Sequence, residues 1–261
     1  MEPSFAGFRD VPAAADAARS WWEANAEAYL AEHGEFLGPD DFCWCPEGLR
    51  EAEAGLLGPI AGKLVLEVGC GAAQCSRWLT GRGAQVLGLD LSGAMLAAAR
   101  RLDHQLGVHT PVLQADARAL PLPDRTFDIA FTAFGALPFV RDTATVHREV
   151  SRVLRPGGRW VFAVTHPLRW AFPDDPEALT ATRSYFDQRP YVETDDAGQV
   201  TYCEYHRTLG DHVAEIAAAG LALDRLVEPV WPAGHQRTWG GWGPVRGALL
   251  PGTAIFCARK P

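Results

Sequence analysis

From Lys63 to Thr165 the chain alternates short apolar runs with longer stretches in which apolar residues recur every three or four positions. Short apolar runs predict strands, and the longer periodic stretches predict helices. The expected strands are Leu64–Val68, Gln85–Asp90, Val112–Ala115, Phe127–Ala133 and Gly158–Val164. The expected helices are Cys75–Gly81, Gly93–Gln105 and Ala144–Leu154. This alternation predicts βαβ units with right-handed crossovers and a parallel sheet.

The region before Lys63 has helical character. Residues 12–33 predict one helix, because Trp22, Ala26 and Tyr29 recur at helical spacing and Gly34 would end it. A loop follows, and then a second helix is expected near Glu47–Leu57.

The alternation stops after Thr165. Within residues 167–210, two strand-like runs on either side of Asp196-Ala197-Gly198 predict a hairpin. A helix is expected next, ending before Gly220, and two last strands should lie within residues 221–230 and 252–260. The sequence contains no internal repeat and no low-complexity linker. We therefore expect an N-terminal helical extension at 1–62 and one α/β domain at 63–261, with a substrate cap inserted at about 167–210.

Composition narrows the class of protein. The chain has 261 residues, of which 48% are hydrophobic and 21% charged, and its formal net charge is -8. These values are typical of a globular domain. The charge is not that of a protein whose main partner is nucleic acid, because phosphates require a basic surface. The N-terminus lacks the pattern of a signal peptide, and no apolar run is long enough to span a membrane, so we expect a cytoplasmic protein without a membrane partner.

Six cysteines are present, and Cys43 and Cys45 form a C-x-C pair near His33. A metal site would usually need C-x-x-C spacing and a second ligand pair. Reduced, partly buried thiols are therefore the favoured interpretation, and no metal site is expected.

A glycine loop follows the first strand of the alternating region. Gly69 and Gly71 come directly after Leu64–Val68. In an open parallel sheet, ligands bind at the carboxyl ends of the strands, where the strand order reverses. Asp90 and Asp116 close the next two strands, and a carboxylate at Asp90 can accept hydrogen bonds from ribose hydroxyls. The pattern predicts a nucleoside site.

The residues around the loop separate three kinds of nucleotide site. A triphosphate loop needs Lys followed by Ser or Thr, but Gln74-Cys75-Ser76 follows here. The dinucleotide fingerprint needs a third glycine where Gln74 stands. Glu67, directly ahead of the loop, is unfavourable beside a pyrophosphate and suits a ligand that carries positive charge.

Four segments in order resemble the class I methyltransferases that use S-adenosylmethionine. They are VLEVGCGAAQCSRWL, VLGLDLSGAMLAAAR, LQADARALPLPDRTFDIAFTAFGALPFV and EVSRVLRPGGRWVFAVTHP, which together cover about Lys63 to Pro167. The last segment is typical of the small-molecule branch that includes quinone-biosynthesis methyltransferases. One departure is Ala72-Ala73, where Thr-Gly or Ser-Gly is commoner. The resemblance implies a Rossmann-like doubly wound sheet of seven mostly parallel strands, with the last strand antiparallel.

The resemblance also implies which residues bind S-adenosylmethionine. They are Glu67, Gly69, Cys70 and Gly71 around the methionine half, Asp90 at the ribose, Leu91 and Met95 on the adenine face, Asp116 and Ala117 at the adenine edge, Ala133 and Phe134 on the methyl side, and Tyr29 closing over the donor. Trp44 could close over the donor with Tyr29.

The chemistry follows from this donor. Its methyl group is already activated, so the protein mainly aligns the acceptor, and a base is needed only when the acceptor must lose a proton. His166 is the candidate base, because it follows the fifth strand. Other candidates lie in the hairpin: Tyr191, Glu204, Tyr205 and His206.

The acceptor should be recognised outside the sheet. Seven of the nine tryptophans lie outside residues 63–165, so an aromatic or apolar small molecule is favoured if several of them line the crevice. Two alternatives remain open: a binder of S-adenosylmethionine without turnover, and an NAD(P)-dependent oxidoreductase.

Overall fold

The computed structural model describes residues 4–11, 15–134 and 136–261. Its main element is a seven-stranded sheet with the strand order β4-β3-β2-β5-β6-β10-β9. The strands are β2 (Leu64–Val68), β3 (Gln85–Asp90), β4 (Val112–Gln114), β5 (Phe127–Thr132), β6 (Leu154–Thr165), β9 (Ala222–Val227) and β10 (Thr253–Arg259). Strands β2 to β6 pair in parallel, and β10 runs antiparallel to both of its neighbours. The expected doubly wound sheet with an antiparallel last strand is confirmed.

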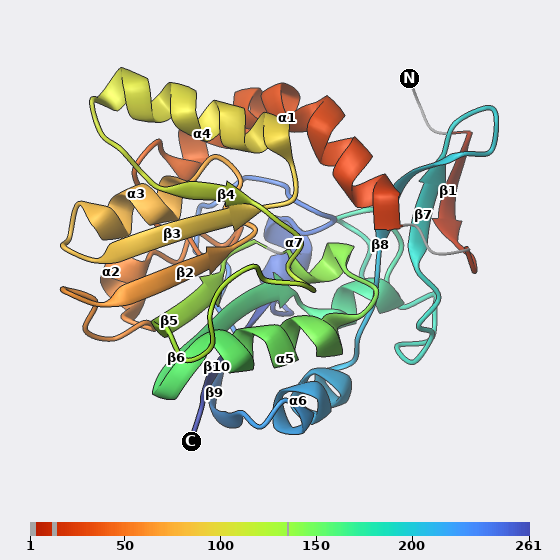
Figure 1. Ribbon diagram of the computed structural model, residues 1–261. Coiled ribbons are helices and arrows are strands. Elements are labelled where there is room, and N and C mark those ends of the chain that lie inside the picture. The colour runs from red at the N-terminus through yellow and green to blue at the C-terminus, as the bar shows by residue number, and fades with distance from the viewer. Residues whose placement is uncertain (1–3, 12–14, 135) are drawn as a thin grey trace.

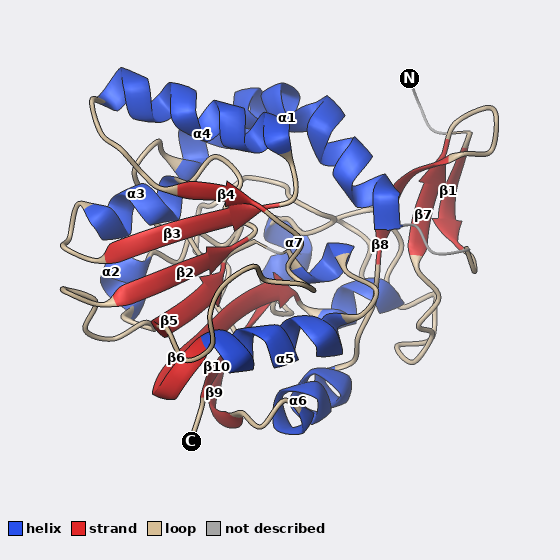
Figure 2. Ribbon diagram, viewed as in Figure 1, coloured by secondary structure: helices blue, strands red, loops and turns tan. Residues whose placement is uncertain are grey.

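Helices cover both faces of this sheet (Figures 1 and 2). They are α1 (Ala15–Leu37), α2 (Glu51–Ala54), α3 (Gln74–Thr80), α4 (Gly93–Leu106), α5 (Thr143–Val153), α6 (Leu209–Ala218) and α7 (Pro244–Gly247), with 3-10 helices η1 (Leu137–Phe139) and η2 (Pro167–Ala171). Successive strand residues alternate between the faces. In β2, Leu66 joins the core under α5 and α6, whereas Val65 joins the core under α2 and α3.

Short-range signals fix the helices that the sequence predicts well. Ser92 caps α4 by accepting a hydrogen bond from the Met95 amide, and Gly107 ends that helix in the left-handed conformation. Asp142 caps α5 by accepting from the Thr145 amide. These boundaries lie within one residue of those expected, because the signals involve only neighbouring residues.

Two N-terminal expectations were wrong. Helix α1 continues past Gly34 to Leu37, and its added turn brings Phe36 against Trp239, so tertiary packing outweighs the glycine. The start expected at residues 12–14 lies outside the described residues. Helix α2 has only four residues, because Gly55 at φ +57° ends it. The buried Glu51 carboxylate accepts from the amides of the extended segment that follows.

The expected hairpin is confirmed as β7 (Tyr191–Thr194) and β8 (Val200–Glu204). The sequence did not predict its third strand, β1 (Phe5–Phe8), which pairs with β7 and joins the N-terminal segment to the hairpin (Figure 1). The division into residues 1–62 and 63–261 stays a prediction. Among the described helices, none combines the length and the apolar character needed to cross a bilayer.

Candidate active site

A cavity of about 710 Å³ opens at the carboxyl ends of the strands, around the glycine loop and the end of β3. The strand order reverses between β2 and β5 at this edge, which is where ligands bind in open α/β sheets. The structure brings together all the residues that the resemblance assigns to the donor. The residues lining the cavity include Tyr29, Glu67, Gly69, Cys70, Gly71, Asp90, Leu91, Met95, Asp116, Ala117, Ala133 and Phe134.

The glycine loop is closely packed at Gly69 and Gly71. Gly69 has φ +71°, and a Cβ there would lie 2.6 Å from the Ala136 Cβ. Gly71 has φ +52°, and its Cβ would meet the Met95 methyl carbon at 3.1 Å. Ala73, at a position where related loops commonly carry glycine, keeps a left-handed φ of 60° as the N-cap of α3. The backbone itself therefore forms this wall of the cavity.

Glu67 and Asp90 place two buried carboxyl groups beside the loop. The Ser76 hydroxyl donates to Glu67 at 2.5 Å, but burial dominates and raises the pKa of Glu67 to about 8. Asp90 accepts from the amides of Gly71 and Ser92, each at 2.8 Å. Burial also raises the pKa of Asp90, against these hydrogen bonds. Both groups favour a ligand that brings positive charge or hydroxyl donors.

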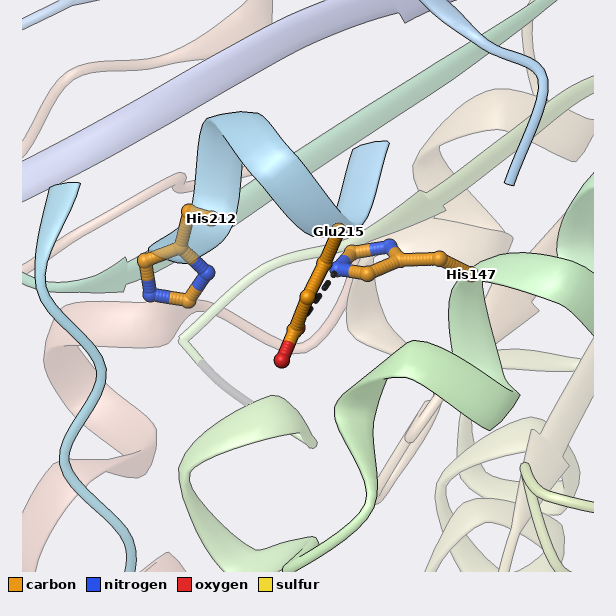
Figure 3. A group of neighbouring side chains, drawn as sticks. All are labelled: His147, His212 and Glu215. Atoms are coloured by element: carbon orange, nitrogen blue, oxygen red, sulfur yellow. Dashed lines mark ion pairs between the residues drawn. The ribbon is translucent and has the colours of Figure 1, made fainter. Parts of the chain in front are cut away.

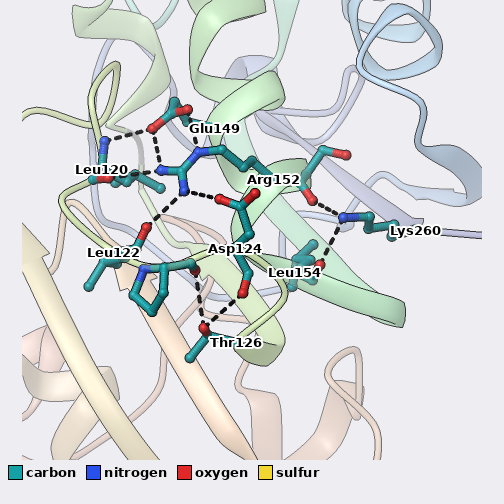
Figure 4. A network of polar contacts seen from close by, with 10 residues as sticks. Leu120, Leu122, Asp124, Thr126, Glu149, Arg152, Leu154 and Lys260 are labelled. Carbon is teal, nitrogen blue, oxygen red and sulfur yellow. Dashed lines mark hydrogen bonds and ion pairs between the residues drawn. The ribbon is translucent and has the colours of Figure 1, made fainter.

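Asp116 closes the far side of the cavity beside Arg118, whose guanidinium lies 2.6 Å away and lowers the pKa of Asp116. The loop that follows is fastened to α5 by Arg152 (Figure 4). Arg152 donates to the carbonyls of Leu120 and Leu122 at 2.9 and 2.8 Å. Ion pairs with Asp124 and Glu149 complete its contacts. The network holds the segment between β4 and β5 in place.

Helix α1 covers the cavity, and only the expected position of Tyr29 over the donor pointed to this role in the sequence. Trp21, Trp22 and His33 line the cavity together with Tyr29. The helix is anchored by Glu23, whose carboxylate accepts from the Gly93 and Ala94 amides at the start of α4, at 2.6 and 2.9 Å. Sequence reasoning missed this contact, because the two segments are 70 residues apart.

Trp239 completes the wall near Phe134. The His33 ring stacks on the Trp239 indole with centroids 3.8 Å apart, and Phe134 lies 4.9 Å from the same indole. Of the seven tryptophans outside the central region, Trp21, Trp22 and Trp239 line the cavity. Trp44 does not: it is fully buried, donates to Glu51 and packs against Phe131. The suggestion that Trp44 closes over the donor is corrected.

The prediction that His166 is the base is also corrected, because its side chain is not part of the cavity lining. It is buried, its Nδ1 accepts from the Leu168 amide at 3.2 Å, and its Nε2 lies 2.9 Å from Glu228. Both ring nitrogens are thus engaged within the protein. Of the hairpin candidates, Glu204 and Tyr205 line the cavity, whereas Tyr191 and His206 do not.

Apart from this cavity, the buried His147 and His212 form a cluster with the half-buried Glu215 between α5 and α6 (Figure 3). The Trp160 indole N–H donates to Nδ1 of His147 at 3.0 Å, which leaves the proton of the neutral ring on Nε2. That nitrogen lies 3.8 Å from Glu215, whose carboxylate already accepts from Thr143 and Arg207. A metal ion needs a bare nitrogen, so this donor set does not suit one. The cysteines, which are all buried and free, agree with the expected reduced thiols.

Comparison with known proteins identifies the family. The family described as "Methyltransferase domain" matches residues 66–162. An S-adenosylmethionine-dependent methyltransferase from Mesorhizobium loti is 30% identical; its structure superposes with a TM-score of 0.65, covering 83% of this chain and 100% of that one. The chain belongs to the S-adenosylmethionine-dependent methyltransferases. This membership agrees with the observed fold, and nothing in the comparisons favours the NAD(P)-dependent oxidoreductase.

Curated relatives in this family cover less of the chain. A demethylmenaquinone methyltransferase from Thermus thermophilus is 42% identical over 103 residues, which are 39% of this chain and 46% of that protein. A ubiquinone biosynthesis O-methyltransferase from Stutzerimonas stutzeri is 31% identical over 159 residues, or 59% and 62% of the two chains. The chain thus spans about half the length of the curated relatives it matches.

The cavity has the chemistry that the family's donor requires. S-adenosylmethionine carries a sulfonium and an ammonium group, which suit an acidic wall, and ribose hydroxyls, which suit a buried carboxylate. The backbone at Gly69 and Gly71, which has no side chains, lets the ligand approach closely. The residues that line the cavity therefore fit S-adenosylmethionine.

Proposed function

We propose that this protein transfers a methyl group from S-adenosylmethionine to a small-molecule acceptor. One observation carries the proposal: the twelve residues that the resemblance assigns to the donor come from distant parts of the sequence and all line one cavity. That cavity lies at the edge of the sheet where the strand order reverses.

In this proposal the donor supplies an activated methyl group, and the chain holds it in place. Gly69 and Gly71 present backbone to the methionine half, with Glu67 beneath it. Asp90 accepts from the ribose, and Asp116 accepts from the adenine amino group. Ala133 and Phe134 line the side from which the methyl leaves. The fixed sheet edge and the covering helix α1 orient the acceptor and exclude water, which is the main source of rate in a reaction with an activated carbon.

The acceptor is proposed to be aromatic. The curated relatives are named for demethylmenaquinone and ubiquinone biosynthesis, and Trp21, Trp22, Phe139 and Trp239 line the cavity here. An acceptor that loses a proton needs a base. His33 is better placed than His166, because it lines the cavity and burial lowers its pKa, which keeps the ring neutral and able to accept.

Calorimetry with S-adenosylhomocysteine tests the donor site. We expect the full chain to bind it, and we expect Asp90→Ala to weaken binding at least about tenfold, because the carboxylate both contacts the ligand and fixes the Gly71 amide. Asp224→Ala is the matched control, since Asp224 pairs with Arg259 at the opposite end of the sheet. Absence of binding by the unmodified protein would refute the proposal. Mass spectrometry of catechols and quinols incubated with donor and protein then tests transfer.

A further inference from the structure

The cavity extends beyond the residues assigned to the donor. Those residues come mostly from the carboxyl ends of β2 to β5. Other lining residues come from α1, η1, β8 and the segment 238–240, all of which lie outside the seven-stranded sheet. We call the part formed by Trp21, Trp22, Phe139, Tyr202 and Glu204 the hairpin lobe. In the proposed function, this lobe is left for the acceptor.

Aromatic rings from three separate elements meet in the hairpin lobe. Tyr202 of β8 lies 5.2 Å from Trp21 of α1 and 5.7 Å from Phe139 of η1, measured between ring centroids. Trp22 lies 5.5 Å from Phe139 and 4.7 Å from Trp21. All four pairs are edge-to-face. Aromatic faces carry partial negative charge, so walls of this kind suit a flat apolar body or a cation.

Glu204 places one carboxylate among these rings. It is the last residue of β8, it lines the cavity, and its Oε1 accepts a hydrogen bond from the Tyr202 hydroxyl. Burial raises the pKa of Glu204, although the positive charge of Arg169 opposes this. Arg169 does not pair with Glu204: it forms an ion pair with Asp174 and donates to the Gly240 carbonyl. One hydroxyl leaves a carboxylate with further acceptor positions, so Glu204 can still pair with a cation.

The charge of the whole lining points the same way. Seven carboxyl groups and two arginines line the cavity among the described residues, so acidic groups outnumber arginines even with Glu67 protonated, and Arg118 is paired with Asp116. An anionic acceptor would meet like charge at close range, whereas a protonated amine would meet opposite charge.

We propose that the hairpin lobe recognises an acceptor that carries a protonated amino group on an aromatic body, with Glu204 as the partner of the ammonium. The inference rests on the proposed function, because it takes this lobe as the acceptor site. The proposal concerns recognition of the ammonium group by Glu204, and it does not specify which atom of the acceptor receives the methyl group. Glu204 then determines specificity, and the four aromatic side chains hold the body of the acceptor.

The test compares three indole probes that differ in the charge of one group. Tryptamine, tryptophol and indole-3-acetate are titrated by calorimetry into the full chain saturated with S-adenosylhomocysteine. We expect tryptamine to bind at least about tenfold more tightly than tryptophol, since a charge-assisted hydrogen bond replaces a neutral one, and indole-3-acetate to bind most weakly. In Glu204→Gln, tryptamine and tryptophol should bind within about twofold of each other.

Glu193→Gln is the matched control. Glu193 lies on the paired strand β7 and accepts from the Tyr191 hydroxyl at 3.0 Å, a contact like that of Glu204, but it does not line the cavity. This variant should keep the preference for tryptamine. Unfolding temperatures with S-adenosylhomocysteine present show whether each variant is folded.

Three results would overturn the inference: no preference for tryptamine in the unmodified chain, a preference that survives in Glu204→Gln, or binding of S-adenosylhomocysteine without binding of any probe. All three leave the proposed function intact, because the donor still binds. Failure of the donor itself to bind is a different result, and it would remove the proposed function.

Discussion

At the scale of single residues, Glu67 couples the donor site to protonation. Its carboxyl group is buried beneath the glycine loop, and its pKa of about 8 means that it is mostly protonated at pH 7. A cationic ligand favours the ionised form, so binding near neutral pH requires Glu67 to release a proton.

We therefore predict that affinity for S-adenosylmethionine, whose sulfonium is positively charged, increases between pH 6 and pH 8 and levels off above the pKa of Glu67. The Glu67 contribution to the slope cannot exceed about tenfold per pH unit, which is the limit for one proton. Calorimetry across this range measures it. Glu67→Gln keeps the size of the side chain and the contact with Ser76 but removes the titration, so its profile should be flatter. Equal slopes in the two proteins would contradict the role of Glu67.

At the scale of elements, the loop between β4 and β5 depends on α5. Arg152 reaches from that helix to two loop carbonyls, while Lys260, near the C-terminus, donates to the carbonyls of Ser151 and Leu154 at the end of the same helix (Figure 4). Asp116 and Ala117, the residues assigned to the adenine edge, lie at the start of this loop. Removal of the Arg152 side chain should therefore loosen this loop and weaken the binding of the donor.

For Arg152→Ala we expect a loss of about 1–3 kcal/mol in the free energy of unfolding, because the Leu120 and Leu122 carbonyls lose their partner, together with a several-fold weaker affinity for S-adenosylhomocysteine. Arg148→Ala is the control on the same helix: within the described part of the chain, its one hydrogen bond is to the Thr145 hydroxyl. Urea unfolding and calorimetry measure both effects. An affinity that is unchanged in Arg152→Ala would show that the loop does not position the donor.

At the scale of the whole molecule, the N-terminal segment joins parts that are far apart in the sequence. Helix α1 lies beside α4, to which it is tied by Glu23 and by the Glu27–Arg101 ion pair. Strand β1, which precedes the helix, pairs with β7 of the hairpin (Figure 1). The segment therefore links α4 to the hairpin, and its helix α1 lines the cavity.

This arrangement predicts that ligand binding stabilises α1. Hydrogen exchange of the amides in residues 15–37 should slow when S-adenosylhomocysteine binds, because Tyr29 and its neighbours on the cavity wall gain contacts. Exchange in α6 should change much less, since its residues do not line the cavity. Mass spectrometry of exchanged peptides compares the two helices. A uniform change in both, or a change in α6 alone, would contradict the covering role of α1.

The sequence by itself determined the sheet, its order of elements and the residues beside the glycine loop. These depend on short-range signals: the alternation of apolar runs, the caps at Ser92 and Gly107, and the left-handed glycines Gly69 and Gly71. Asp90 and Asp116 could be placed because parallel strands end at one edge.

Only the tertiary structure decided which side chains outside the βαβ pattern point into the cavity and which residues they contact. His166 follows a strand, as expected of a catalytic residue, yet the fold brings Glu228 against its ring, and His166 is not among the residues that line the cavity. Trp44 fills the core, whereas Trp239, almost two hundred residues later, lines the cavity and stacks on His33. Glu204 reaches the cavity because a hairpin crosses towards α1. These contacts join residues that are distant in sequence, and no local pattern encodes them, because they depend on how whole elements pack.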